Sequence, residues 1–157
     1  MTDSNLQKQR HFSRSCNEDV LLNIGLKRVS NSSLFKSTAG HLFLSPGISE
    51  GLHEKYWFDI RDVNFQKMTK ETKNFVLLRI VPAWFAFFPL DHIRRYLNKK
   101  TKDIRKNSGI VYGFYCELDE NNRAIEITAK NDMAAKFSVA LLNRGKVQQD
   151  LSTALKI

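Results

Sequence analysis

Glycine, proline and cysteine are all scarce in this sequence. Its 157 residues include 7 glycines, 3 prolines and 2 cysteines, which excludes a collagen-like, low-complexity or disulfide-rich chain. Cys16 and Cys116 are a hundred residues apart, and the four histidines form no zinc-ligand spacing with them. We therefore expect no structural zinc and two reduced thiols, as is usual for an intracellular protein.

The sequence also lacks a long hydrophobic run. Its most apolar window, residues 75–90, is interrupted by Arg79, Pro82 and Pro89, whereas a membrane helix needs about 20 apolar residues. The first fifteen residues are polar and basic, without the apolar stretch of a secretory signal. We expect a cytoplasmic protein without a membrane partner, in which a flexible basic arm (1–15) precedes one domain (16–157).

Acidic residues are outnumbered by basic ones, 16 to 25, which gives a formal net charge of +9. Residues 94–106 hold seven of the basic residues against one acid, Asp103. Apolar residues recurring between Ile93 and Ile104 predict a helix over 90–106 that carries this charge. Such a positive surface is typical of contacts with a nucleic-acid backbone, and the alternative is a solvated helix face. The predicted nucleic-acid-binding residues are Arg94, Arg95, Lys99, Lys100, Lys102, Arg105 and Lys106.

Strand patterns dominate the rest of the chain, with helical spacing near both ends. The predicted strands cover residues 41–45, 56–61, 74–81, 84–88, 111–118, 123–128 and 136–142, and the predicted helices cover 17–27, 90–106 and 147–155. The last three strands are separated by short, turn-rich segments, which predicts a meander. This order of elements predicts an α+β single domain with a mixed or antiparallel sheet flanked by helices.

Two features of the apolar centre each have two interpretations. The aromatic run at 84–88 lies between two prolines and fits either a core strand or an interface with another subunit. Arg79 interrupts an apolar strand, where a charge is rare unless it is paired. Its candidate partners are Asp59, Asp62 and Glu126. The alternative is that Arg79 lines an anion site together with Arg61.

The segment WFDIR provides the candidate catalytic residues. In a strand, Asp59 and Arg61 project from the same face with Trp57 beside them. A carboxylate and a cation side by side can hold a divalent metal and stabilise a phosphate that is being cleaved. The metal needs a second carboxylate, for which the candidates are Glu50, Glu54 and Glu18. The alternative is a surface ion pair between Asp59 and Arg61.

Three stretches of the sequence, in their order, resemble the PD-(D/E)XK nuclease-like superfamily. They are NEDVLLNIG at 17–25, YWFDIR at 56–61 and FVLLRIVPAWFAFFPLDHI at 75–93. The resemblance implies Mg²⁺-dependent cleavage of DNA, with the second-motif acid at Asp59, Glu18 as the helix acid and Glu50 or Glu54 as the first-motif acid. Arg61 stands in the position of the family's lysine, where it stabilises charge but does not act as a base. No Pro-Asp dipeptide is present.

These observations predict a nucleic-acid-directed protein, with a Mg²⁺-dependent DNA endonuclease-like domain as the leading hypothesis. Asp59, Arg61 and Glu50 are its candidate catalytic residues, and a homodimer is compatible with cleavage of both strands. Two alternatives stay open. One is a non-catalytic basic module that binds DNA or RNA, and the other is a protein-interaction subunit that uses the aromatic strand 84–88.

Overall fold

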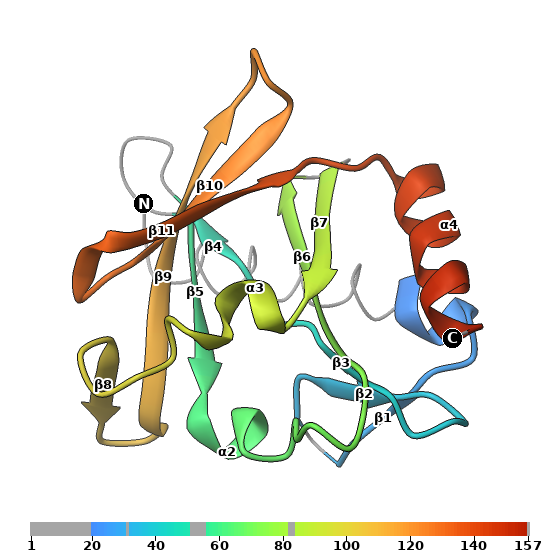
Figure 1. Ribbon diagram of the computed structural model, residues 1–157, viewed down its shortest axis with the longest axis horizontal. Coiled ribbons are helices and arrows are strands. Elements are labelled where there is room, and N and C mark those ends of the chain that lie inside the picture. The colour runs from blue at the N-terminus through green and yellow to red at the C-terminus, as the bar shows by residue number, and fades with distance from the viewer. Residues whose placement is uncertain (1–19, 31, 51–55, 82–83, 157) are drawn as a thin grey trace.

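The described part of the chain forms two β-sheets (Figure 1). The computed structural model describes residues 20–30, 32–50, 56–81 and 84–156. The first sheet, called sheet A, has the strand order β1-β2-β3-β6-β7. Neighbouring strands are antiparallel except β3 and β6, which run parallel. Its strands are β1 (Lys27–Arg28), β2 (Leu34–Lys36), β3 (Leu42–Leu44), β6 (Asn74–Val81) and β7 (Trp84–Pro89).

The second sheet, called sheet B, is antiparallel throughout and has the order β11-β10-β9-β5-β4. A short additional strand, β8, pairs with the beginning of β9, along the same edge that β10 occupies further on. Strands β9, β10 and β11 form the predicted meander. The strands of sheet B are β4 (Ser49–Glu50), β5 (Tyr56–Arg61), β8 (Lys102–Arg105), β9 (Gly109–Asp119), β10 (Ala124–Ala129) and β11 (Asp132–Ala140).

Three helices lie wholly within the described residues. Two are short, α2 (Asp62–Phe65) and α3 (Asp91–Arg94), and α4 (Arg144–Leu155) is longer; residues 20–23 are also helical. The Asn143 side chain caps α4 by accepting a hydrogen bond of 2.8 Å from the backbone N–H of Lys146. The predicted α+β class is confirmed, as are the predicted strands and the C-terminal helix. The predicted arm at 1–15 lies outside the described residues.

Two hydrophobic cores explain the layers of the fold. Residues from both sheets, among them Phe58, Phe88 and Phe114, form one core. The other core joins sheet A to α4 and includes Phe85 of β7 and Leu151 of α4. In Figure 1, α4 is seen at the end of sheet A away from sheet B. Both faces of sheet A therefore contribute to a core.

The aromatic strand β7 serves both cores, because its side chains alternate between the two faces of sheet A. Phe85 and Phe87 belong to the core that includes α4, whereas Ala86 and Phe88 belong to the core between the sheets. Phe85 and Phe88 are only 3% and 2% exposed. The interpretation of this run as a core strand is confirmed. The hairpin predicted between β6 and β7 is also present.

The helix predicted over 90–106 is wrong. Only Asp91–Arg94 is helical, and β8 begins at Lys102. Between them, the Asn98 side chain accepts hydrogen bonds from the backbone N–H groups of Lys100 (2.9 Å) and Thr101 (3.3 Å). The Thr101 hydroxyl, fully buried, donates to the carbonyl of Tyr96 at 2.5 Å. These side-chain bonds replace helical backbone bonds, and the dense positive charge adds repulsion between turns of a helix.

Arg79 is buried on β6, with 4% of its surface exposed. Two of its predicted partners are bonded to other groups, since Asp59 pairs with Arg105 and Asp62 accepts a hydrogen bond from Tyr112. Burial and the bond to Asp62 raise the pKa of Tyr112.

Within the described ranges, no helix combines the length and apolarity needed to cross a bilayer.

Cys116 gives a direct test of the core between the sheets. Its side chain is fully buried and free, and burial raises the pKa of its thiol. We predict that in a Cys16→Ser variant the native protein resists a thiol-specific reagent, because the reactive thiolate is neither formed nor accessible. Absorbance after addition of the reagent measures this, with the same protein in denaturant as the fully reactive control. Rapid stoichiometric labelling of the native protein would contradict burial of Cys116 in this core.

Candidate nucleic-acid interface

The outward face of β5 carries the residues singled out in WFDIR. Phe58 and Ile60 are buried, at 1% and 0% exposure, while Trp57 and Asp59 are half-buried and Arg61 is exposed. This alternation is the ordinary period of a strand with one face on a core. The prediction that Trp57, Asp59 and Arg61 share one face is confirmed.

The register of β5 against β9 determines what lies beside these side chains. Trp57 is opposite Tyr115, and Asp59 is opposite Gly113. Residues directly opposite in an antiparallel pair lie on the same side of the sheet. Two aromatic rings therefore lie next to each other on the outer face of sheet B, followed by a carboxylate with no side chain opposite it.

Lys130 covers this pair of rings. Its Nζ is 4.1 Å from the centroid of the Trp57 ring and 5.3 Å from that of Tyr115, within the range of cation–π attraction. The backbone N–H of Lys130 donates to the carbonyl of Gly113 at 2.9 Å, which fixes where the side chain starts. A Cβ at position 113 would lie 2.8 Å from Cδ of Lys130. Glycine at 113 thus provides the space that the lysine chain occupies.

Asp59 is bonded to Arg105 rather than to Arg61. The two guanidinium Nη atoms of Arg105 donate to the two carboxylate oxygens of Asp59, with Nη2–Oδ1 at 3.1 Å. Asp103 adds a second carboxylate, with an oxygen 3.6 Å from Nε of Arg105. The hydrogen bonds with Asp59 raise the pKa of Arg105. Since β5 and β8 flank β9, this bidentate pair bridges the strand between them.

The basic segment is spread over several environments instead of one helix. Arg94 pairs with Asp91, Lys100 pairs with Asp132, and Arg105 pairs with Asp59. Among the residues that the structure describes, four of the seven predicted cations form no ion pair, and Arg95 among them lies over the Tyr96 ring. The four are Arg95, Lys99, Lys102 and Lys106.

Three of these cations lie at or beside β8, an edge strand of sheet B. They are Lys99, Lys102 and Lys106, and all three are exposed. Arg61 adds a fourth exposed cation, opposite Val111 on β9, which is itself opposite Asp103 on β8. At the other end of the sheet, Glu117 and Glu126 are register partners. Lys102 is opposite Tyr112, which is opposite Ile60, so its position is on the inner side of the sheet. On the outer face, Arg61 is the exposed cation near β8, and Glu117 and Glu126 lie beyond the aromatic pair.

The predicted metal ligands are not brought together within the described residues. Glu18 and Glu54 lie outside them, and Glu50 is described only by its backbone, in β4 opposite Tyr56. In the part of the chain that the structure describes, no group of three His, Cys, Asp or Glu residues is placed to hold a metal ion. The Mg²⁺ site therefore stays a prediction.

Sequence reasoning missed Tyr115, Gly113 and Lys130 as parts of this face. Gly113 gave a signal, because an isolated glycine inside a strand pattern indicates close approach of another group. Tyr115 follows from the alternation of the strand once its inner face is known. No sequence signal indicated Lys130. It lies beside β9 because it directly follows β10 and its backbone N–H donates to the carbonyl of Gly113.

Comparison with protein-family models, with curated proteins and with solved structures gives no match to this chain. The resemblance to the PD-(D/E)XK nucleases therefore remains a prediction from the three stretches of sequence. The function of sheet B's outer face is therefore inferred from its own residues.

We predict that Asp59→Ala lowers the free energy of unfolding by about 1–2 kcal/mol, because it leaves the Arg105 guanidinium without its bidentate acceptor. Asp91→Ala is the matched control, since the Asp91–Arg94 pair is also an ion pair but its carboxylate side chain is 84% exposed. The control should change stability by less than about 0.5 kcal/mol. Urea unfolding followed by circular dichroism measures both, and equal losses would contradict the bridging role of Asp59.

Proposed function

We propose that this chain is a non-catalytic nucleic-acid-binding module that holds an unpaired segment on the outer face of sheet B. The observation that carries the proposal is the register pair of Trp57 and Tyr115 under the ammonium of Lys130. Aromatic side chains on an open sheet next to lysines and arginines are what single-strand binding needs: rings for the bases and cations for the phosphates.

The spacing of the two rings suits consecutive bases. Side chains directly opposite on neighbouring strands have Cβ atoms about 4.5–5.5 Å apart. A single strand can place one base on each ring while its backbone crosses the two strands. Each stacked base contributes about 1–3 kcal/mol, largely independent of which base it is. Affinity without strict sequence preference follows from this arrangement.

Lys130 acts as a removable cover in this proposal. Its ammonium rests over both rings in the free protein, at an energy of about 0.5–2 kcal/mol. Its long side chain can move aside without displacing the backbone bond to Gly113. A base then takes its place over the ring, and the ammonium reaches a phosphate.

The backbone of the bound strand would run toward the end of the face near β8. Arg61 on β5 and Lys106, directly after β8, are exposed there without ion-pair partners among the described residues. Each phosphate that they neutralise releases condensed counterions. The bound strand would thus extend from the aromatic pair toward the β8 side.

Binding is favoured over cleavage by the state of Asp59. Both oxygens of its carboxylate accept hydrogen bonds from Arg105. A metal ion at Asp59 would have to replace a bidentate, charge-assisted partner. The pair instead fixes β8, and the cations around it, against the strands that carry the rings.

We predict that Trp57→Ala and Tyr115→Ala each weaken binding of a single-stranded oligonucleotide about tenfold, because each removes one stacking surface. Fluorescence anisotropy of labelled single-stranded DNA and RNA, with the matching duplexes in parallel, measures this. Trp57→Phe and Tyr115→Phe are the matched controls, since they retain a ring and should stay within about threefold of the parent. The proposal is wrong if duplexes bind as tightly as single strands, or if the alanine variants keep the parent's affinity.

The same oligonucleotides test cleavage. With Mg²⁺ present we expect binding but intact substrate, and an unchanged result when the metal is chelated, because Asp59 is engaged by Arg105. Denaturing gels read the outcome. Mg²⁺-dependent cleavage that is lost in a folded Asp59→Ala variant would overturn the non-catalytic proposal and support the endonuclease hypothesis.

A further inference from the structure

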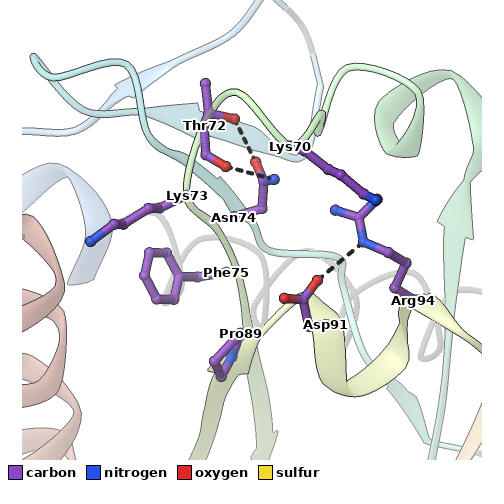
Figure 2. Close-up of a pocket in the computed structure, with 8 residues that line it drawn as sticks. All are labelled: Lys70, Thr72, Lys73, Asn74, Phe75, Pro89, Asp91 and Arg94. Carbon is purple, nitrogen blue, oxygen red and sulfur yellow. Dashed lines mark hydrogen bonds and ion pairs between the residues drawn. The ribbon is translucent and has the colours of Figure 1, made fainter.

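A second polar site lies where β6 begins and β7 ends, and its residues are not those of the proposed interface. An open cavity of about 400 Å³ lies between the segment that leads into β6 and the beginning of α3 (Figure 2). Its lining residues are Lys70, Thr72, Lys73, Asn74, Phe75, Pro89, Asp91 and Arg94. None of them belongs to the outer face of sheet B, so a ligand in this cavity is independent of the proposed function.

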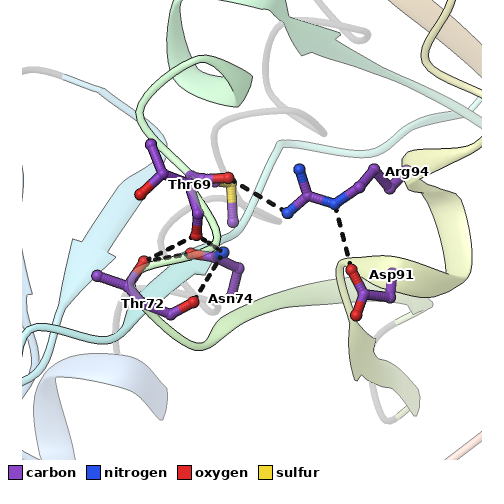
Figure 3. A network of polar contacts seen from close by, with 6 residues as sticks. Thr69, Thr72, Asn74, Asp91 and Arg94 are labelled. Atoms are coloured by element: carbon purple, nitrogen blue, oxygen red, sulfur yellow. Dashed lines mark hydrogen bonds and ion pairs between the residues drawn. The ribbon is translucent and has the colours of Figure 1, made fainter.

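Hydrogen bonds within the protein order one wall of this cavity (Figure 3). The Thr72 hydroxyl donates to Oδ1 of Asn74 at 2.8 Å. The Asn74 amide donates to the carbonyls of Thr69 and Thr72, at 2.7 and 3.1 Å. The backbone N–H of Lys73 donates to Nδ1 of His41 at 3.2 Å. The turn that presents Lys70 and Lys73 is therefore formed before any ligand binds, which lowers the entropy cost of binding.

Arg94 is fixed on the opposite wall. Its Nε donates to Asp91 at 3.2 Å and its Nη2 donates to the carbonyl of Met68 at 3.3 Å. Its guanidinium also lies 5.7 Å from the centroid of the Phe65 ring. Nη1 has no hydrogen bond to any residue that the structure describes. A positioned guanidinium with a donor left over is suited to an anion.

The charges around the cavity are unbalanced. Three cations, Lys70, Lys73 and Arg94, line the cavity together with a single carboxylate, Asp91, which is already bonded to Arg94. Figure 2 shows the Lys70 side chain extending toward the Arg94 guanidinium. Neither Lys70 nor Lys73 forms an ion pair with any described residue. Two cations that point at each other repel, and an anion between them turns that repulsion into two attractions.

The rest of the lining is apolar and rigid. Phe75 stacks on Phe43 with centroids 5.1 Å apart and on Phe87 at 5.3 Å, so its ring is held in place. Figure 2 shows this ring and Pro89 below Thr72 and Asn74, with Asp91 and Arg94 to their right. Pockets that combine an apolar wall with a few fixed polar groups bind small organic molecules, and 400 Å³ is within their usual size range.

We propose that this cavity binds a nucleoside monophosphate or a close analogue. Its phosphate lies between Lys70 and Arg94 (Figure 2). Thr72 is within the lining, and its hydroxyl, which donates to Asn74, can accept a hydrogen bond from the sugar. The flat base packs against Phe75 and Pro89. The phosphate provides most of the binding energy, and the ring distinguishes a nucleotide from a bare anion.

Titration of the full chain with four probes tests this proposal: adenosine monophosphate, adenosine, ribose 5-phosphate and inorganic phosphate. Calorimetry, or amide shifts in NMR spectra, gives the dissociation constants. We expect the nucleotide to bind at least about tenfold more tightly than any of the other three probes. Lys70→Gln should weaken nucleotide binding about fivefold or more, and Lys73→Gln less, since only the Lys70 side chain extends toward Arg94.

Lys67→Gln is the matched control, because Lys67 is exposed in the same segment but does not line the cavity. Its affinity for the nucleotide should equal that of the parent, and the melting temperatures of all three variants should agree. Absence of nucleotide binding at about 10 mM would overturn the proposal. So would inorganic phosphate binding as tightly as the nucleotide, or a loss in Lys67→Gln equal to that in Lys70→Gln.

Discussion

The antiparallel pairing of β5 with β9 is the constraint on which both the core and the proposed interface depend. In one register it stacks Phe58 on Phe114 inside, with centroids 5.4 Å apart, and sets Trp57 beside Tyr115 outside. Because strand side chains alternate strictly, a slip of one residue would move every inner ring outward. The buried phenylalanines therefore fix the position of the exposed aromatic pair. An interface specified in this way needs no separate stabilisation.

The location of the proposed interface follows from how the two sheets are covered. Sheet A contributes to a core on each face, one against sheet B and one against α4. Sheet B packs on sheet A by one face, while Arg61, Tyr115 and Lys136 on the other remain exposed. A strand with both faces buried reads as continuously apolar, and one with a single buried face alternates. This difference is visible between NFVLLRIV and YWFDIR, so the sequence itself distinguishes the structural sheet from the one available for binding.

Local patterns predicted the strands well and failed where distant pairing decides the outcome. β5, β6, β7 and the meander follow from alternation, β-branched residues and turn signals. Residues 90–106 fit helical spacing at Ile93 and Leu97, but Ile104 is placed by its partner Ile110 on β9. No local signal reports that pairing. The like charges along the segment weaken a helix, and the bonds of Asn98 and Thr101 end it. For the same reason, only parts of the candidate site were predictable. Asp59 and Arg105 were each identified as candidate site residues. Their ion pair joins residues 46 positions apart in the sequence, and the residues next to either one do not indicate it.

The positive charge on and beside β8 has two explanations: protection of an edge strand from aggregation, and attraction of a phosphate-bearing partner. An edge strand with unpaired backbone groups is protected from aggregation by charged side chains, and lysine is the common choice. Protection of that kind is served by either sign. Of the charged residues on and beside β8, Asp103 alone is acidic, and it contacts Arg105, while Lys99, Lys102 and Lys106 are exposed and unpaired with any described residue. Mixed charges would protect the edge with less self-repulsion. On the proposed function, the phosphates of the bound strand would offset this self-repulsion, so the same lysines would serve edge protection in the free protein and binding in the complex.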